Sequence, residues 1–248
     1  MTSLVSLHPS SDIRRSAAPA LAAAFCLQSI LALGLLAAHA IGPAGALADS
    51  AVFGAGAAVL WRGLGQLADD RFGLANAVTL LRWTLIALLP GLILAARLPA
   101  YHPPSPPTGW AIVILGALTL GLDGVDGRIA RRRGQATDFG ARFDMEVDAA
   151  FVLGLSLLTW AAGLVPAWVL LSGALRYLWI GAGMAWAVLR RPLRPSRLRR
   201  SICAIQLGLL LGCLIPDLPH PSSILLAGLG LGLLAWSFSR DLVFLLRS

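Results

Sequence analysis

Long apolar stretches constrain this chain more than any other feature. A helix needs about 20 mostly apolar residues to cross the roughly 30 Å hydrocarbon core of a bilayer. Only 13% of the 248 residues are charged, whereas an ordinary soluble domain has about 25%. The sequence therefore predicts an all-α integral membrane protein with little chain left for a separate soluble domain. Helical apolar stretches are expected at about 17–41, 46–61, 74–96, 109–130, 138–163, 166–189, 201–215 and 222–246.

The loops between these stretches set the expected topology. All twenty basic residues are arginines. If the spans alternate in direction, the loops on one side of the membrane contain only Arg97, and the arginine-rich loops lie on the other side. Cytoplasmic loops carry an excess of basic residues, so we expect a multi-pass protein of the cell (inner) membrane with cytoplasmic termini. The one-sided arginines are Arg14, Arg15, Arg62, Arg71, Arg131 to Arg133, the cluster from Arg190 to Arg200, and Arg247.

The net charge of +8 does not indicate nucleic-acid binding. The arginines lie at the ends of apolar runs, where they anchor helices and attract anionic lipid headgroups. A nucleic-acid-binding protein would carry them on a polar, basic surface. We therefore expect membrane lipids, and no nucleic acid, as partners.

The N-terminal region allows two interpretations. Two arginines, an apolar run and the small-residue sequence at 38–40 resemble a secretory signal with its cleavage site. The run is longer than the core of a typical signal peptide, which favours a retained span over cleavage within residues 1–40. The second stretch is the weakest span, because Asp49 and Arg62 lie near its ends.

A group of aspartates gives the clearest functional signal, in the segment LDGVDGRIARRRGQATDFGARFDMEVD. On a helix, Asp123 and Asp126 lie on one face, and Asp144 and Asp148 form a stripe on the next helix. A break near 132–137 would turn the second helix back beside the first. The spacing therefore predicts two pairs of aspartates that face each other.

Such a group needs compensation. A carboxylate near the centre of a bilayer costs about 2.5–3.5 kcal/mol, and four together repel one another. An all-oxygen cluster suits hard cations, so we expect two divalent ions, Mg²⁺ or Mn²⁺. Gly127 and Gly140 would let a phosphate approach the backbone, and Arg131 would bind it. The alternative is that the aspartates form structural ion pairs with Arg128, Arg131 or Arg142.

The motif D-x2-D-G-x2-A-R-x8-G-x3-D-x3-D is complete from Asp123 to Asp148. It resembles the signature of the CDP-alcohol phosphatidyltransferases (class I), and the resemblance covers about 72–246. It implies a six-helix transmembrane bundle core, commonly dimeric, with a polar cavity open to the cytoplasm. Residues 72–248 would form this membrane domain, and residues 1–71 an N-terminal extension with one or two additional transmembrane helices.

The resemblance also implies an activity in phospholipid biosynthesis. Members transfer a phosphatidyl or related phospho-alcohol group from a CDP-linked donor, such as CDP-diacylglycerol, to an alcohol acceptor and release CMP. By resemblance, the metal-binding aspartates are Asp123, Asp126, Asp144 and Asp148, of which Asp148 is also the general base. The nucleotide and donor contacts would come from Gly127, Arg131, Thr137 and Gly140, with Asn76 and Thr79 of LANAVTLLR as weaker candidates.

The acceptor is not named by the sequence. Arg176 lies within an apolar stretch, where a buried arginine is a functional candidate. It would hold the phosphate of an acceptor or pair with a motif aspartate. Many relatives with phosphorylated acceptors have an acidic residue after this arginine and a lysine nearby, whereas this chain has Tyr177 and no lysine. A different function, a divalent-cation carrier that uses the aspartates as its transport site, is the alternative; a catalytically idle scaffold would not need all four aspartates.

Overall fold

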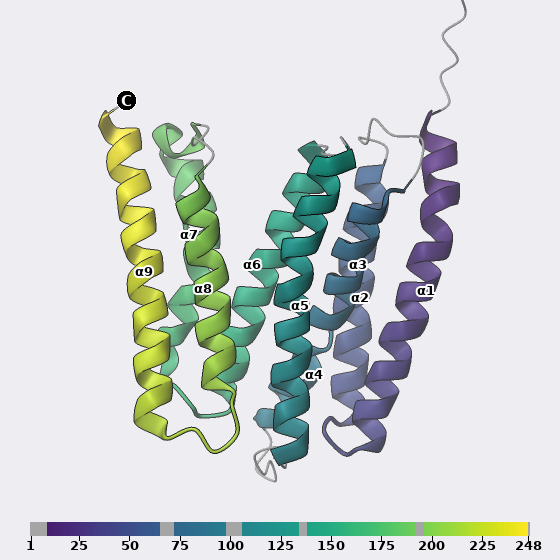
Figure 1. Cartoon of the computed structure of the whole chain (residues 1–248), viewed down its shortest axis with the longest axis horizontal. Coiled ribbons are helices and arrows are strands. Elements are labelled where there is room, and N and C mark those ends of the chain that lie inside the picture. The colour runs from purple at the N-terminus through teal and green to yellow at the C-terminus, as the bar shows by residue number, and fades with distance from the viewer. Residues whose placement is uncertain (1–8, 65–71, 98–105, 134–137, 192–195, 248) are drawn as a thin grey trace, which may run out of the picture. The chain divides into compact units, whose positions relative to one another are not determined.

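The computed structural model is built from α-helices (Figure 1). It describes residues 9–64, 72–97, 106–133, 138–191 and 196–247, and no strand occurs among them. The predicted all-α class is therefore confirmed. The helices are α1 (Pro9–Ala37), α2 (Pro43–Gly63), α3 (Leu74–Ile86), α4 (Leu89–Ala96), α5 (Pro106–Arg133), α6 (Asp138–Ala161), α7 (Leu170–Ala185), α8 (Arg197–Cys213) and α9 (His220–Arg247).

Several of these helices have the length and composition of membrane spans. Within the described residues, five segments are long and apolar enough to cross a bilayer. They are Ile13–Ala37, Pro43–Gly63, Leu74–Ala96, Ala167–Ala185 and His220–Arg247. The prediction of a membrane protein with several spans is confirmed, and the number of helices in the core stays a prediction.

Proline determines how the third apolar stretch folds. In a continuous helix, the ring of Pro90 would clash with the carbonyl of Ile86, and Pro90 has no N–H to donate. The helix accordingly ends at Ile86 and restarts as α4 at Leu89. Proline is tolerated in a first turn, and α5 begins at Pro106, three residues before the expected apolar stretch 109–130.

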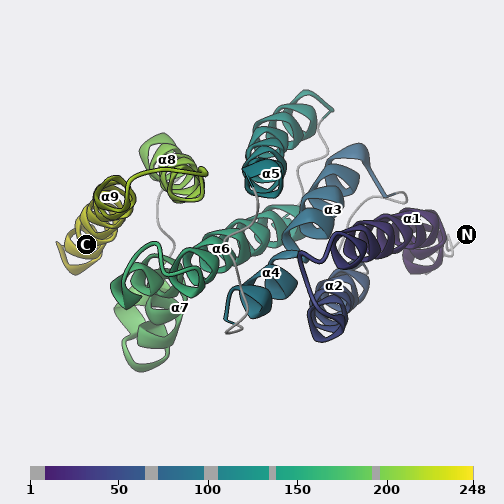
Figure 2. The ribbon, with the colours of Figure 1, turned by 90° about the horizontal axis from the view of Figure 1, so that it is seen from below.

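The chain divides into two compact units, each of which combines distant parts of the sequence. Unit 1 contains Met1–Gly91 with Gly121–Val147, and unit 2 contains Leu92–Leu120 with Asp148–Ser248. In unit 1, α1 and α2 form an antiparallel pair that packs against α3 (Figures 1 and 2). The division of the sequence at residue 72 into an extension and a membrane domain stays a prediction.

Hydrogen bonds fix the α1–α2 pair to the helices that follow. The backbone N–H of Phe72 donates to Ser16 Oγ at 2.8 Å. The indole Nε1–H of Trp83 on α3 donates to the carbonyl oxygen of Phe53 on α2 at 3.2 Å. Both contacts join segments that are far apart in the sequence.

A buried contact of α2 involves Asp49. Its side chain is fully buried, and Oδ1 accepts a hydrogen bond from the backbone N–H of Gly91 at 2.6 Å. Gly91 lies in the first turn of α4, where backbone N–H groups have no partner within the helix. A Cβ atom on Gly91 would lie 2.6 Å from Asp49 Oδ2, so glycine is required for this close approach.

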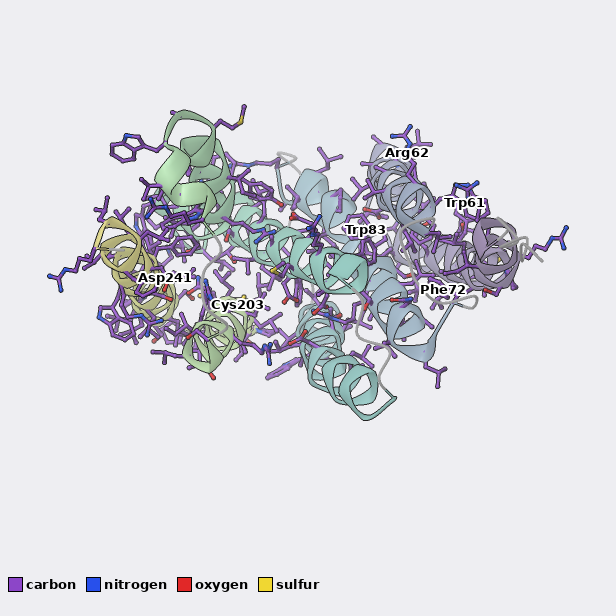
Figure 3. All side chains as sticks on the ribbon, turned by 90° about the horizontal axis from the view of Figure 1, so that it is seen from above. Trp61, Arg62, Phe72, Trp83, Cys203 and Asp241 are labelled. Carbon is purple, nitrogen blue, oxygen red and sulfur yellow. The ribbon has the colours of Figure 1, made fainter. Side chains whose placement is uncertain are left out.

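Unit 2 is organised around the antiparallel hairpin of α8 and α9, with α7 packed against α9. Trp179 of α7 meets Phe238 of α9 edge to face, with ring centroids 5.4 Å apart. Near one end of the hairpin, Arg199 pairs with Asp241 at 3.3 Å. Cys203 of α8 and Asp241 of α9 are labelled in Figure 3.

Candidate active site

Three of the motif aspartates converge in the structure. Asp123 lies on α5, and Asp144 and Asp148 lie one turn apart on α6. Each offers a carboxylate oxygen, and these three oxygens lie within 4.8 Å of one another. The predicted break near 132–137 agrees with the end of α5 at Arg133 and the start of α6 at Asp138. The three residues therefore lie together as the spacing predicts, and their roles stay predictions.

Arg82 of α3 adds a positive charge to this cluster. Its side chain is fully buried, and Nη1 lies 3.1 Å from Asp123 Oδ1 and 2.5 Å from Asp144 Oδ1. The two carboxylates are 25% and 34% exposed, so one edge of the cluster remains open. A buried guanidinium thus offsets part of the repulsion between the aspartates.

Arg82 is not among the predicted site residues, although its position in the sequence indicates a role. Arg82 lies inside the apolar stretch 74–96, and a charged residue within a membrane span is a functional candidate by default. The same reasoning selected Arg176. The structure therefore adds an arginine of α3 to the aspartate cluster, which was predicted from α5 and α6. On α3, only Asn76 and Thr79 were predicted, and these as nucleotide contacts.

The converging groups fit a divalent cation. They present only carboxylate oxygens, the ligand type that hard ions such as Mg²⁺ and Mn²⁺ prefer. Two of the oxygens already contact Arg82. A cation at this position would therefore share the aspartates with the guanidinium.

The family of this chain follows from its similarity to known proteins. The family model for CDP-alcohol phosphatidyltransferase matches residues 72–239, which include Arg82 and the complete aspartate motif. The chain belongs to the CDP-alcohol phosphatidyltransferase family. The resemblance inferred from the motif is thereby confirmed.

Two curated relatives carry the same name. They are the proteins called "Probable phosphatidylglycerophosphate synthase" of Mycobacterium tuberculosis strains CDC 1551 / Oshkosh and ATCC 25618 / H37Rv. Each is 32% identical to this chain over 145 residues, which is 55% of this chain and 64% of the relative. The matched region thus spans less than two thirds of the length of these relatives. No solved structure matches this chain significantly.

Four of the remaining predicted site residues lie within the described part of the chain. Gly140 is half-buried near the start of α6, and Asn76 is half-buried on α3. Thr79 is buried, and its hydroxyl donates to the carbonyl oxygen of Ala75 at 3.1 Å, an ordinary contact within a helix. Arg176 is half-buried in the middle of α7. The side chains of Asp126 and Arg131, the surroundings of Gly127 and the whole of Thr137 lie outside the part of the chain that the structure describes.

Proposed function

We propose that this chain transfers a phosphatidyl group from CDP-diacylglycerol, or a closely related CDP-linked lipid, to an alcohol and releases CMP. The observation that carries the proposal is the convergence of Asp123, Asp144 and Asp148. These residues belong to the motif by which the chain resembles its family, and they come from two helices. An isolated structural ion pair would not require three carboxylates in one place.

The proposed reaction forms one bond and breaks one. The acceptor oxygen attacks the lipid-side phosphorus, and the bond from that phosphorus to the oxygen of CMP breaks. Asp148 accepts the proton of the acceptor hydroxyl as general base. Asp123, Asp126 and Asp144, with Asp148, would hold two divalent cations. When bound, such cations neutralise the charge of the donor's pyrophosphate.

Arg82 supports this chemistry by holding two of the carboxylates. Its guanidinium contacts both Asp123 and Asp144, which lie on different helices. A group that must act in one geometry works better when its neighbours are fixed in advance. Arg82 is therefore a positioning residue in our proposal.

For the acceptor, we propose an alcohol that itself carries a phosphate. Arg176 is a half-buried arginine within a span, and a guanidinium binds phosphate with two parallel hydrogen bonds. The name of the two relatives also refers to a phosphorylated product, phosphatidylglycerophosphate. Tyr177 and the absence of lysine distinguish this chain from many members with such acceptors, so the choice between phosphorylated alcohols requires an experiment.

The test is release of CMP from labelled CDP-diacylglycerol by the purified chain with Mg²⁺. The acceptors offered are glycerol 3-phosphate, inositol phosphate, glycerol, inositol and no alcohol. We expect release only with an alcohol, and fastest with a phosphorylated one. An Arg176→Gln variant should raise KM for a phosphorylated acceptor more than for its unphosphorylated partner. Movement of Mg²⁺ into sealed vesicles without CMP release would instead support the cation carrier.

We propose further that the arginine-rich loops face the cytoplasm, because cytoplasmic loops carry an excess of basic residues. The arginine distribution predicts that Pro104 lies outside the cell and Pro195 inside. Cysteines introduced at these positions, in a chain whose Cys26, Cys203 and Cys213 are replaced by alanine, should react differently with an impermeant thiol reagent. We expect intact cells to label only the cysteine at 104. Labelling only at 195 would reverse the orientation. A homodimer stays a prediction.

A further inference from the structure

The α1–α2 pair contains an open groove that the proposed reaction does not use. Its volume is about 520 Å³, within the range of small-molecule sites, which is about 300–1,000 Å³. Both helices precede the part of the chain matched by the family, residues 72–239. The groove therefore calls for an explanation of its own.

Small residues of α2 create the groove. Gly54, Ala57 and Ala58 line it and fill little space. Apart from the two neighbouring residues and the backbone of the same helical turns, no described atom lies within 4 Å of the position that a Cβ on Gly54 would take. By contrast, Gly56 lies against Trp83 of α3, whose ring would be 2.1 Å from an added Cβ. The face of α2 that bears Gly54 is thus open, and the face that bears Gly56 is packed.

The two ends of the groove differ in chemistry. At one end, the rings of Phe25 and Phe53 lie with centroids 5.9 Å apart and form an aromatic floor. At the other end are Trp61 and Arg62, both exposed, and the guanidinium of Arg14 lies 5.8 Å from the Trp61 ring centroid. Figure 3 shows Trp61 on the side of α2 that faces α1, with Arg62 beside it.

The length of the groove matches one leaflet of a bilayer. From Phe53 to Trp61, α2 rises by about 12 Å, at about 1.5 Å per residue. Half of a hydrocarbon core is about 15 Å. The groove is apolar along this length and ends at a tryptophan and an arginine, which are typical of the membrane interface. An acyl chain could therefore lie along the groove, with its headgroup at the Trp61 end.

We propose that this groove binds an anionic phospholipid. One acyl chain lies against the small residues of α2 and reaches the Phe25–Phe53 floor, and the phosphate is held by Arg62 and Arg14. Charge complementarity decides the headgroup. Two arginines at the rim favour a lipid with net negative charge, because a zwitterionic headgroup brings its own cation to the same place. The site is separate from the aspartate cluster.

The experiment uses the full chain in phosphatidylcholine vesicles that contain increasing fractions of phosphatidylglycerol with brominated acyl chains. Bromine quenches tryptophan fluorescence at short range, and the signal of Trp61 is the difference between the natural chain and Trp61→Phe. The same titration is then made with brominated phosphatidylcholine. We expect quenching of Trp61 to reach half its maximum at a phosphatidylglycerol fraction at least about fivefold lower, since each arginine near an anionic surface contributes about that factor.

Two variants and one matched control test the geometry. Arg62→Gln combined with Arg14→Gln should abolish the preference for phosphatidylglycerol. Gly54→Leu fills the groove and should reduce quenching of Trp61 by both lipids. Gly34→Leu is the control: it adds the same side chain at an open, exposed position of α1, outside the groove, and should change neither titration.

Three outcomes would overturn the proposal. Equal titrations for the two lipids would mean that only ordinary surrounding lipid reaches Trp61. An unchanged titration for Gly54→Leu would mean that the groove is not the binding site. An absence of quenching by either lipid would mean that something else covers the groove, and disulfide cross-linking of a Gly54→Cys variant would identify a second copy of the chain as that occupant.

Discussion

Replacement of Arg82 by glutamine would leave two neighbouring carboxylates without the guanidinium that contacts both. Loss of one partner of a buried ion pair costs about 3–5 kcal/mol. Asp123 and Asp144 are 25% and 34% exposed, so water can reach them in part and we expect about 2–3 kcal/mol. For a chain of this size, each kcal/mol lowers Tm by about 2–4 °C. Arg82→Gln should therefore lower the metal-free Tm by about 4–12 °C.

The assay is thermal unfolding in detergent, at one fixed scan rate because membrane proteins often unfold irreversibly. It is run first in excess chelator and then with saturating Mg²⁺. A bound cation would restore positive charge at the aspartates, so the difference between Arg82→Gln and the natural chain should shrink when Mg²⁺ is added. Arg82→Lys keeps the charge but loses the planar fork that contacts two carboxylates, and it should fall between the two.

Arg199→Gln is the matched control. It also removes an arginine from an ion pair, with Asp241 at 3.3 Å, but Arg199 is 34% exposed. Pairs of this kind contribute about 0–1 kcal/mol, and Mg²⁺ should not change the result. If Arg82→Gln lowered the metal-free Tm no more than Arg199→Gln does, the proposed charge balance would be refuted. An equal difference with and without Mg²⁺ would show that the cation does not bind beside Arg82.

Three further predictions concern the reaction and the packing. Release of CMP should stop in excess chelator and resume with Mg²⁺ or Mn²⁺, and full activity without metal would count against the cation site. Asp148→Asn should lower turnover by a factor of about 10²–10⁴ but still bind CDP-diacylglycerol. Asp123→Asn should weaken donor binding as well. Near-normal turnover in Asp148→Asn would assign the base to another group. Gly91→Ala should lower the free energy of unfolding by about 1–3 kcal/mol, because its Cβ would lie 2.6 Å from Asp49 Oδ2. Gly232→Ala should not, because no described atom outside its own helical turns lies within 4 Å of the added Cβ.

The helices and most of the aspartate cluster could be predicted because they depend on local sequence. Apolar stretches of sufficient length predict spans, and the spacing of Asp144 and Asp148 places both on one helical face. Arg82 could not be assigned to the cluster in this way. It lies 62 positions before Asp144, and spacing within a helix says nothing about which distant helix packs against it. Only its place within an apolar stretch indicated a role.

Asp49 shows a second limit of local reasoning. In the sequence it weakens the second apolar stretch, because a carboxylate inside a span is costly. In the structure, the same carboxylate accepts a hydrogen bond from the backbone N–H of Gly91. This N–H lies in the first turn of α4, because the helix is interrupted before Pro90. Two separate defects, a charged residue in one helix and a proline in another, thus compensate each other. A reading of either stretch alone does not reveal this.

The bonds from the α1–α2 pair to Phe72, Trp83 and Gly91 limit how this chain could be shortened. A fragment beginning at residue 72 would keep the matched motif but lose the acceptors of three N–H groups. Water can replace a lost acceptor for a surface group, but an unsatisfied group in hydrocarbon costs several kcal/mol. A fragment cut at the start of the family match should therefore express poorly and be degraded. A shorter form for crystallisation or activity assays should retain α1 and α2.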